Sequence, residues 1–420
     1  MVKPSKYIVD QQRKIYYTLF VVFAVLIVLG LVNVFSSTFV ADRVETGNTY
    51  YHLIRQIFII LLGAGLSFVA YKMDYHHCDT GLRYLCIMTG LFLVLVLVAG
   101  VNVNGAKRWL GYGPAVFQPS ELAKLAVILY AASYLAPMLK RGERIHLFHP
   151  LSRRRRQPWW KHLPIIPHEA LWFPLFVTGM VALQPDMGTA GVILAIPSVM
   201  VFISGARLRE AKWPLLAAAG LILVYTSWAE YRRNRLVSWL DPWSYEQTLG
   251  YQTVQGLIAI GSGGITGQGV GSGVSKFSYL PEAHTDFAFA IFAQEWGLIG
   301  SAVMLGAFVI LVIYGMSCAL QTKDAYGMML AVGVTMYLGG QGFINIGMVC
   351  GLLPVVGVPL PFISYGGTSL LINMIAAALL LNVAKRNWRQ ASRVYQRALE
   401  QAAPAPPLMK EETRSRFIPR

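Results

Sequence analysis

Residues 16–39 read YYTLFVVFAVLIVLGLVNVFSSTF, a stretch without a single charged side chain. It is too long for a buried β-strand, and it lacks the alternation of apolar and polar residues found in strands of outer-membrane barrels. Inside lipid, a segment must satisfy its own backbone hydrogen bonds, so the stretch predicts a transmembrane helix. Similar runs recur as far as about residue 384. We therefore predict one polytopic membrane domain over residues 16–384.

The composition agrees with this prediction. Of the 420 residues, 55% are hydrophobic and 13% are charged, and the mean hydropathy is +0.50. A water-soluble domain of this length is far less apolar. With about 20 residues for each span, the sequence predicts an all-α fold of about ten transmembrane helices. They are expected near residues 16–39, 53–71, 84–101, 118–138, 170–184, 187–204, 213–229, 285–316, 326–350 and 367–384. The fifth and sixth meet at Gln184-Pro185-Asp186, as either a broken pair or a tight hairpin.

The net charge of +16, from 36 Lys and Arg against 20 Asp and Glu, would suggest nucleic acid for a soluble protein. Here most basic residues fall on one side of the predicted spans, as the positive-inside rule requires. We therefore expect no nucleic-acid partner, and we place the N-terminal segment 1–15 and the basic tail 385–420 in the cytoplasm. The four arginines at 153–156 are interpreted as a topology signal or a contact with anionic membrane lipids.

This orientation leaves three loops outside the cell membrane, at 40–52, 102–117 and about 230–284. Long loops in compact membrane domains usually carry function. The longest contains the glycine-rich stretch 261–273, which must be irregular, and before it residues 251–260 predict a short amphipathic helix. Neither a phosphate-binding loop nor a dinucleotide fingerprint is present in the sequence.

The four cysteines show no CxxC spacing and are expected to be packing residues rather than disulfide or zinc ligands. His284 lies in no HExxH pattern, so zinc is not indicated. The sequence thus requires no cofactor.

Ionisable residues inside apolar spans are costly unless they are paired or face water, so each is a functional candidate. In FQPSELAK, Glu121 and Lys124 are three residues apart and share one helical face. They are expected to pair within the membrane, as part of a binding site or as a structural ion pair that locks two helices. Asp186, in LQPDMG, either contributes to a site or caps the helix that follows it.

The densest cluster of titratable residues outside the membrane is in YLPEAHTDFAFAIFAQEWG (279–297), where the long loop re-enters the membrane. It contains Glu282, His284 and Asp286. A carboxylate in this position can act as a general base for a hydroxyl delivered from outside. The alternative role of Asp286 is to cap the helix that begins there.

The segment GLLPVVGVPLPFISYGGTS (351–369) cannot form a continuous helix because of its prolines and glycines. Irregular backbone at membrane depth is tolerated where it lines a cavity or is buried in protein. Ser364 and Tyr365 are therefore expected to border the same outward cavity as Asp286, or else to form a kinked packing contact.

Taken together, these motifs resemble the SEDS family (shape, elongation, division and sporulation) of polytopic peptidoglycan glycosyltransferases. Five stretches carry the resemblance and follow the family order: NGAKRWLGYGPAVFQPSELAKL (104–125), LQPDMGTA (183–190), GYQTVQGLIAIGSGGITGQGVG (250–271), YLPEAHTDFAFA (279–290) and INIGMVCGLLPVVGVPLPFISYGGTSLL (344–371). The resemblance implies a ten-helix fold with both termini in the cytoplasm and a location in the bacterial inner membrane.

The resemblance also implies the chemistry. The 4-hydroxyl of one lipid II disaccharide would attack the anomeric carbon of another with inversion, and undecaprenyl pyrophosphate would leave. The family's essential loop aspartate corresponds to Asp286. Lys107, Arg108 and Lys124 become candidates for binding the pyrophosphate, with Glu121 positioning Lys124. A divalent cation could share this charge, although no ligand set in the sequence establishes one.

Within the family, PEAHTD is more similar to the division type (FtsW) than to the elongation type (RodA), which often carries a larger residue in place of Ala283. The resemblance implies a class B penicillin-binding protein, a transpeptidase, as partner. Two other functions stay open from the residues alone. One is a lipid II flippase that uses the pair of Glu121 and Lys124 together with broken helices, and the other is a non-enzymatic scaffold.

Overall fold

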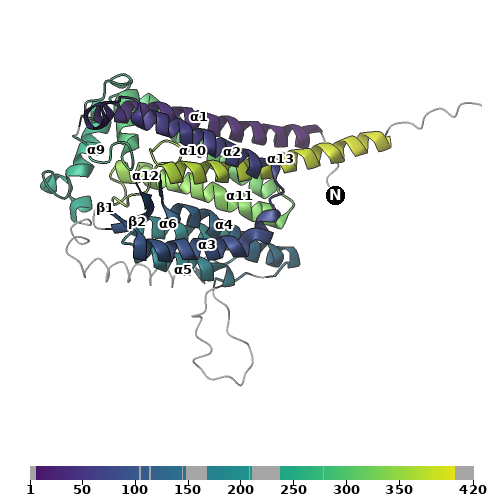
Figure 1. Ribbon diagram of the computed structural model, residues 1–420. Coiled ribbons are helices and arrows are strands. Elements are labelled where there is room, and N and C mark those ends of the chain that lie inside the picture. The colour runs from purple at the N-terminus through teal and green to yellow at the C-terminus, as the bar shows by residue number, and fades with distance from the viewer. Residues whose placement is uncertain are drawn as a thin grey trace, which may run out of the picture.

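A computed structural model describes residues 6–103, 106–112, 115–143, 145–147, 168–207, 209–210, 237–277 and 279–402. Within these ranges, seven helices are long and apolar enough to cross a membrane. They lie side by side in one bundle (Figure 1). The prediction of an all-α polytopic membrane protein is therefore confirmed, whereas the helix predicted at 213–229 lies outside the described residues.

The bundle is built from helices that contain the apolar runs, although α1 and α13 extend beyond them into charged sequence. The long ones are α1 (Lys6–Thr46), α2 (Tyr51–Lys72), α3 (His77–Ala99), α4 (Pro119–Arg141), α10 (Ala288–Gln321) and α13 (Gly367–Ala402). The seventh span runs from Ala325 to Val349 as α11 (Ala325–Thr335), the π-helix η4 (Met336–Gly340) and α12 (Gln341–Val349). Shorter helices are α5 (Trp172–Ala182), α6 (Met187–Ile203), α9 (Tyr251–Ser262), and the 3-10 turns η2 (Glu169–Leu171) and η3 (Trp243–Tyr245).

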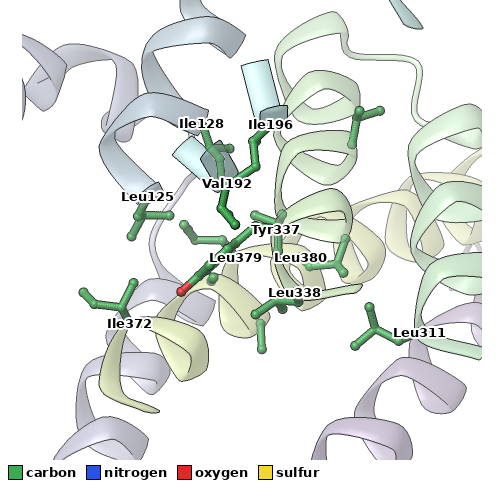
Figure 2. Packing of buried hydrophobic residues seen from close by; sticks show 14 of the residues in the cluster. Leu125, Ile128, Val192, Ile196, Leu311, Tyr337, Leu338, Ile372, Leu379 and Leu380 are labelled. Atoms are coloured by element: carbon green, nitrogen blue, oxygen red, sulfur yellow. The ribbon is translucent and has the colours of Figure 1, made fainter. Parts of the chain in front are cut away.

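The core lies where α4, α6, α11 and α13 meet around Tyr337, which is fully buried (Figure 2). Figure 2 shows aliphatic side chains of these helices around its ring, among them Ile128, Val192 and Leu379. The outward faces of α2 and α3 are apolar as well, with Leu61 and Leu91 more than 60% exposed. Large apolar surfaces of this kind are stable only in lipid, because in water they would favour aggregation.

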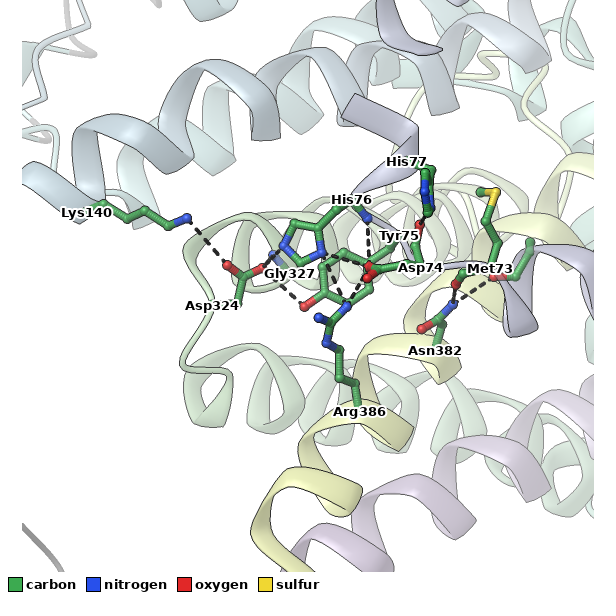
Figure 3. Close-up of polar contacts among 11 residues, drawn as sticks. Met73, Asp74, Tyr75, His76, His77, Lys140, Asp324, Gly327, Asn382 and Arg386 are labelled. Atoms are coloured by element: carbon green, nitrogen blue, oxygen red, sulfur yellow. Dashed lines mark hydrogen bonds and ion pairs between the residues drawn. The ribbon is translucent and has the colours of Figure 1, made fainter. Parts of the chain in front are cut away.

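The two ends of the bundle differ in character. The start of α1 and the end of α13 lie at one end, and α9 with the strands β1 and β2 lies at the other (Figure 1). At the first end, Figure 3 shows a polar cluster that joins the connection between α2 and α3 to α4, α11 and α13. Asp324 lies 3.7 Å from Lys140 and 3.2 Å from His76, and Asp74 pairs with Arg386. These residues lie in or next to the basic segments that the sequence predicts to be cytoplasmic, so this end of the bundle is the predicted cytoplasmic end.

Asp74 is held in its charged form at this end. Its partial burial would raise the pKa of the carboxyl, but hydrogen bonds from His76 and Arg386 outweigh this and lower the pKa to about 2. The carboxylate therefore stays negative across the physiological range and ties α13 to the connection between α2 and α3.

Several elements differ from the sequence predictions. Residues 101–117, predicted as the end of a helix and a loop, form a three-stranded antiparallel sheet of β1 (Val101–Val103), β2 (Ala106–Tyr112) and β3 (Ala115–Phe117). Helix α13 continues to Ala402, into the predicted tail, because no proline interrupts the sequence before Pro404. The fifth and sixth predicted helices pack against each other as α5 and α6, which identifies the hairpin alternative as the right one.

The predicted helix 285–316 begins at Ala288 and is interrupted at Gly297, whose φ of 64° and ψ of −163° are not helical. The glycine-rich segment fills this gap. The amides of Gln268 and Gly269 donate to the carbonyls of Gln294 and Glu295, and the amide of Leu298 donates to the carbonyl of Gly264. The segment therefore provides partners for the backbone groups that the kink in α10 releases.

Candidate functional site

Asp286 lies just before α10 and close to α9, since a Cβ atom on Gly256 of α9 would lie 2.8 Å from the ring of the next residue, Phe287. Asp286 is only partly buried, so solvent can reach it. Helix α10 begins at Ala288 with Phe287 at the N-cap position. Asp286 therefore lies one residue before the N-cap position of α10.

Two segments of the chain fix the backbone around Asp286. The Nδ2 atom of Asn345 donates to the carbonyl oxygen of Asp286 at 2.8 Å and to that of Val358 at 2.7 Å. A Cβ atom on Gly357 would lie 3.3 Å from Oδ2 of Asp286, and Gly357 has φ of 68°. The carboxylate thus lies directly beside the irregular segment that follows α12, where only glycine combines this φ with this close approach.

Glu282 turns the chain ahead of Asp286. It is exposed and has a left-handed φ of 53°, and its carbonyl accepts hydrogen bonds from the amides of Thr285 and Phe287 at 3.2 and 3.1 Å. Its carboxylate accepts a hydrogen bond from the hydroxyl of Thr285. Glu282 therefore shapes the turn that presents Asp286.

His284 and Tyr365 bring the two irregular segments together. The amide of Tyr365 donates to the carbonyl of His284 at 2.8 Å, and their rings are 6.0 Å apart. Ser364, predicted beside them, is buried and closes a turn by accepting from the amide of Leu360 at 2.8 Å. The two segments are thus in contact two residues from Asp286, and the cavity that they are expected to border stays a prediction.

A histidine and an aspartate that the sequence reasoning missed join this cluster. The ring of His52 lies 4.6 Å from that of Tyr365 and 5.6 Å from that of His284. The Nδ1 atom of His52 pairs with Oδ1 of Asp42, which is 1% exposed. Both residues fall in the predicted outer loop 40–52, outside the predicted spans, so the rule that flags ionisable residues at membrane depth did not apply to them.

Burial sets the protonation of two residues in this cluster, His284 and Tyr365. It lowers the pKa of His284, and the neighbouring His52 lowers it further, so the ring is held in its neutral form. Burial also raises the pKa of the Tyr365 phenol, which therefore stays protonated.

Glu121 and Lys124 form the ion pair that their spacing predicts. Nζ of Lys124 lies 2.6 Å from Oε1 of Glu121, and the two side chains are 0% and 1% exposed. The same Nζ donates to Oε1 of Gln341 at 2.9 Å and lies 5.4 Å from the centre of the Tyr337 ring. The pair is thus enclosed by protein groups on α4, η4 and α12.

The remaining candidates lie around the sheet and the hairpin of α5 and α6. Arg108 donates to the carbonyls of Gln184 and Pro185, and Lys107 is exposed and donates to the carbonyl of Val98 at 3.3 Å. Asp186 is 4% exposed and accepts from the amide of Thr189 at 3.2 Å, as an N-cap of α6. The contact that Asp186 makes is therefore the helix cap that the sequence offered as one of its two roles.

A second buried ion pair was missed. Lys276 and Glu295 pair at 2.6 Å, and Ser36 donates to Glu295 at 2.6 Å. Glu295 lies in an apolar helix, so the same rule on intramembrane charges would have identified it. Among the residues that the structure describes, no three His, Cys, Asp or Glu side chains come together as a metal site, and a divalent cation stays a prediction.

Comparisons with known proteins support the resemblance that the motifs suggest. A family model for FtsW, RodA and SpoVE, described as "Cell cycle protein", matches residues 16–389. The chain is 37% identical over 369 residues to the probable peptidoglycan glycosyltransferase FtsW of Coxiella burnetii, with 86% of this chain and 93% of that protein covered. It is 35% identical to the stage V sporulation protein E of Bacillus subtilis, with coverage of 87% and 96%.

Two solved structures share the fold. A chain from a peptidoglycan synthase complex that coordinates polymerization and crosslinking superposes with a TM-score of 0.69 at 30% identity, covering 88% of this chain and 98% of that chain. The rod shape determining protein RodA of Thermus thermophilus superposes with a TM-score of 0.61 at 28% identity, with coverage of 88% and 97%.

Proposed function

Because the chain belongs to the SEDS family of FtsW, RodA and SpoVE proteins of the bacterial inner membrane, we propose that it polymerises lipid II into glycan strands, with Asp286 as the catalytic base. The activity is that of an inverting peptidoglycan glycosyltransferase. Several curated relatives bear the name FtsW, which favours a role in division over one in elongation.

In this reaction the 4-hydroxyl oxygen of the acceptor sugar attacks the anomeric carbon of the donor. The new carbon–oxygen bond forms on one face while the bond to the pyrophosphate breaks on the other. The electron pair of the broken bond leaves with undecaprenyl pyrophosphate, and the hydroxyl proton passes to the carboxylate of Asp286. A correctly placed general base contributes about 10²- to 10⁴-fold to such a step.

The observation that supports this role best is the setting of Asp286. It is a partly buried carboxylate beside an irregular segment, at the end of the bundle opposite the cluster of predicted cytoplasmic charges. Its main chain is held from α12 rather than left to a mobile loop. A base fixed in this way loses little freedom when a substrate arrives.

The leaving pyrophosphate needs cations, because negative charge develops on it as the bond breaks. Lys107 and Arg108 on β2 are the proposed contacts, since Lys107 is exposed and Arg108 is partly exposed. Lys124 is enclosed and already neutralised by Glu121. We therefore propose that Lys107 and Arg108 of β2 bind the pyrophosphate and that the buried pair of Glu121 and Lys124 supports the structure of the site.

A class B penicillin-binding protein is the proposed partner. The chain resembles, at 30% identity, a protein solved in a complex that coordinates polymerization and crosslinking. A transpeptidase beside this polymerase would crosslink each strand as it is made.

The test is polymerisation of labelled lipid II by the purified protein together with its transpeptidase. Asp286→Asn is expected to abolish glycan formation while expression and thermal unfolding stay unchanged. Asp241→Asn is the matched control, because Asp241 lies in the same predicted outer loop, is exposed, and among the described residues accepts its side-chain hydrogen bonds from Ser244. Polymerisation retained in Asp286→Asn would reject the assignment. Flipping of lipid II in liposomes without polymer would instead support the transporter alternative.

A further inference from the structure

One face of α12 presents two buried amide side chains toward the site. Gln341 and Asn345 are four residues apart, one helical turn, and they are 1% and 0% exposed. Buried amides are costly unless their polar atoms are paired. Their hydrogen bonds therefore show what these two residues do.

Asn345 joins two segments that are far apart in sequence. Its single Nδ2 group donates both to the carbonyl of Asp286 and to that of Val358. Val358 follows Gly357, whose backbone lies beside the carboxylate of Asp286. One side chain thus holds the aspartate and the surface against which its carboxylate rests.

Gln341 continues the connection toward the buried ion pair. Its Nε2 donates to the carbonyl of Pro359 at 2.8 Å, and its Oε1 accepts from Nζ of Lys124 at 2.9 Å. Lys124 is in turn paired with Glu121. A continuous set of hydrogen bonds and one peptide segment therefore runs from the ion pair in α4 to the main chain of Asp286.

The helix is distorted where this connection begins. The π-helix η4 lies directly before Gln341 and contains Tyr337, whose ring lies beside Lys124. A π-turn inside an α-helix is rare and is frequently found at functional sites. Because it precedes α12, the turn sets the direction in which both Gln341 and Asn345 point.

We infer that Asn345 and Gln341 are positioning residues for the glycosyl transfer, and that the pair of Glu121 and Lys124 is their anchor. The inference rests on the proposed function, because it assigns these residues a role only through Asp286. A buried ion pair adds little net stability compared with apolar residues. Because Lys124 of this pair holds Gln341, the pair has a role in positioning that its small contribution to stability does not explain.

The expected effect of losing the connection is a slower chemical step. A displacement of about 1 Å at a reacting group can cost about 100-fold in rate. Asn345→Ala is therefore expected to lower kcat by about 10- to 100-fold and to change KM by less than about 3-fold, since the Asn345 side chain is 0% exposed and acts through the main chain of Asp286. Gln341→Met is expected to act in the same direction with a smaller loss.

The molecule offers a matched control. Nδ2 of Asn382, in α13, also bridges two backbone carbonyls, those of Ala70 and Met73, but at the opposite end of the bundle. Asn382→Ala removes the same kind of contact, so it is expected to lower the unfolding temperature and leave kcat per folded molecule unchanged. Thermal unfolding gives the folded fraction for each variant.

A double variant separates positioning from general damage. Asp286→Glu moves the carboxylate by one methylene and is combined with Asn345→Ala. If Asn345 acts through the placement of Asp286, the combined loss in kcat is smaller than the product of the two single losses. If the losses multiply, or if Asn345→Ala behaves like Asn382→Ala, the inference is wrong. Neither of these results bears on the proposed function, which is rejected instead if Asp286→Asn still polymerises or if the natural protein flips lipid II without making polymer.

Discussion

Lys276 and Glu295 form an ion pair that is closed off from solvent, with side chains 0% and 1% exposed and 2.6 Å between Nζ and Oε1. Lys276 belongs to the loop that follows the glycine-rich segment, and Glu295 belongs to α10. Ser36 of α1 donates to Glu295 and accepts from Lys276 at 3.2 Å. The pair thus joins the loop to two transmembrane helices, α1 and α10.

Removing one partner of this pair is expected to destabilise the protein strongly. Lys276→Met would leave an uncompensated buried carboxylate, at a cost of about 3–5 kcal/mol. Thermal unfolding in detergent is the measurement. The double variant Lys276→Met with Glu295→Leu should recover most of the loss, because it removes both charges. An unchanged unfolding temperature in the single variant would contradict the enclosed pair.

Asp186 allows its two candidate roles to be separated. Asp186→Asn keeps an acceptor for the amide of Thr189 and is expected to retain stability, whereas Asp186→Ala should lose about 1 kcal/mol. If Asp186 is only a cap, polymerisation per folded molecule is the same in both variants. A loss of activity in Asp186→Asn at unchanged stability would instead point to a contact with substrate.

Gly188, in the first turn of α6, lies against the segment that supports Asp286. A Cβ atom there would be 2.0 Å from the carbonyl oxygen of Val356, so Gly188→Ala must push this segment aside. We expect a lower unfolding temperature together with a loss of polymerisation. Gly191, one turn further along α6, is the control because a Cβ atom there meets nothing within 4 Å. Gly191→Ala should be neutral or stabilising by up to about 1 kcal/mol.

His284 makes the stability depend on pH. Its pKa in the folded protein lies below the usual value because of burial and the neighbouring His52. The unfolded chain therefore binds the proton more readily, and stability falls as the pH drops below about 6.5. His284→Gln removes this contribution. Between about pH 7.5 and 5.5 the variant should lose less stability than the natural protein, and equal slopes in thermal unfolding would refute the prediction.

The apolar pattern predicted most of the fold because a membrane helix is a local structure. Each span satisfies its own backbone, so the run at 16–39 indicates a helix whatever surrounds it. The prediction was wrong where the conformation of a segment depends on contacts with other segments. Strands β1, β2 and β3 pair with one another where a loop was predicted. Gly297 leaves the helical conformation because the glycine-rich segment supplies hydrogen-bond partners at the kink.

The candidate site shows the same division. Asp286 was found from its sequence position, since a carboxylate before an apolar helix is conspicuous. Glu121 and Lys124 were paired correctly because their spacing of three residues is a property of one helix. Asn345 and Gln341 carry no charge. Asn345 lies within the stretch 344–371 that carries the resemblance, but the sequence indicates no role for either side chain beyond packing.

By itself, the sequence determined that this chain is a polytopic membrane protein and that Asp286 stands where one of its helices begins. Both follow from interactions over a few residues, chiefly hydrophobic length and helix spacing. Only the tertiary structure decided which distant groups meet: Asn345 with Asp286, Lys124 with Gln341, and Lys276 with Glu295. Such contacts depend on how whole helices pack, and the packing is set by many side chains at once rather than by any one stretch of sequence.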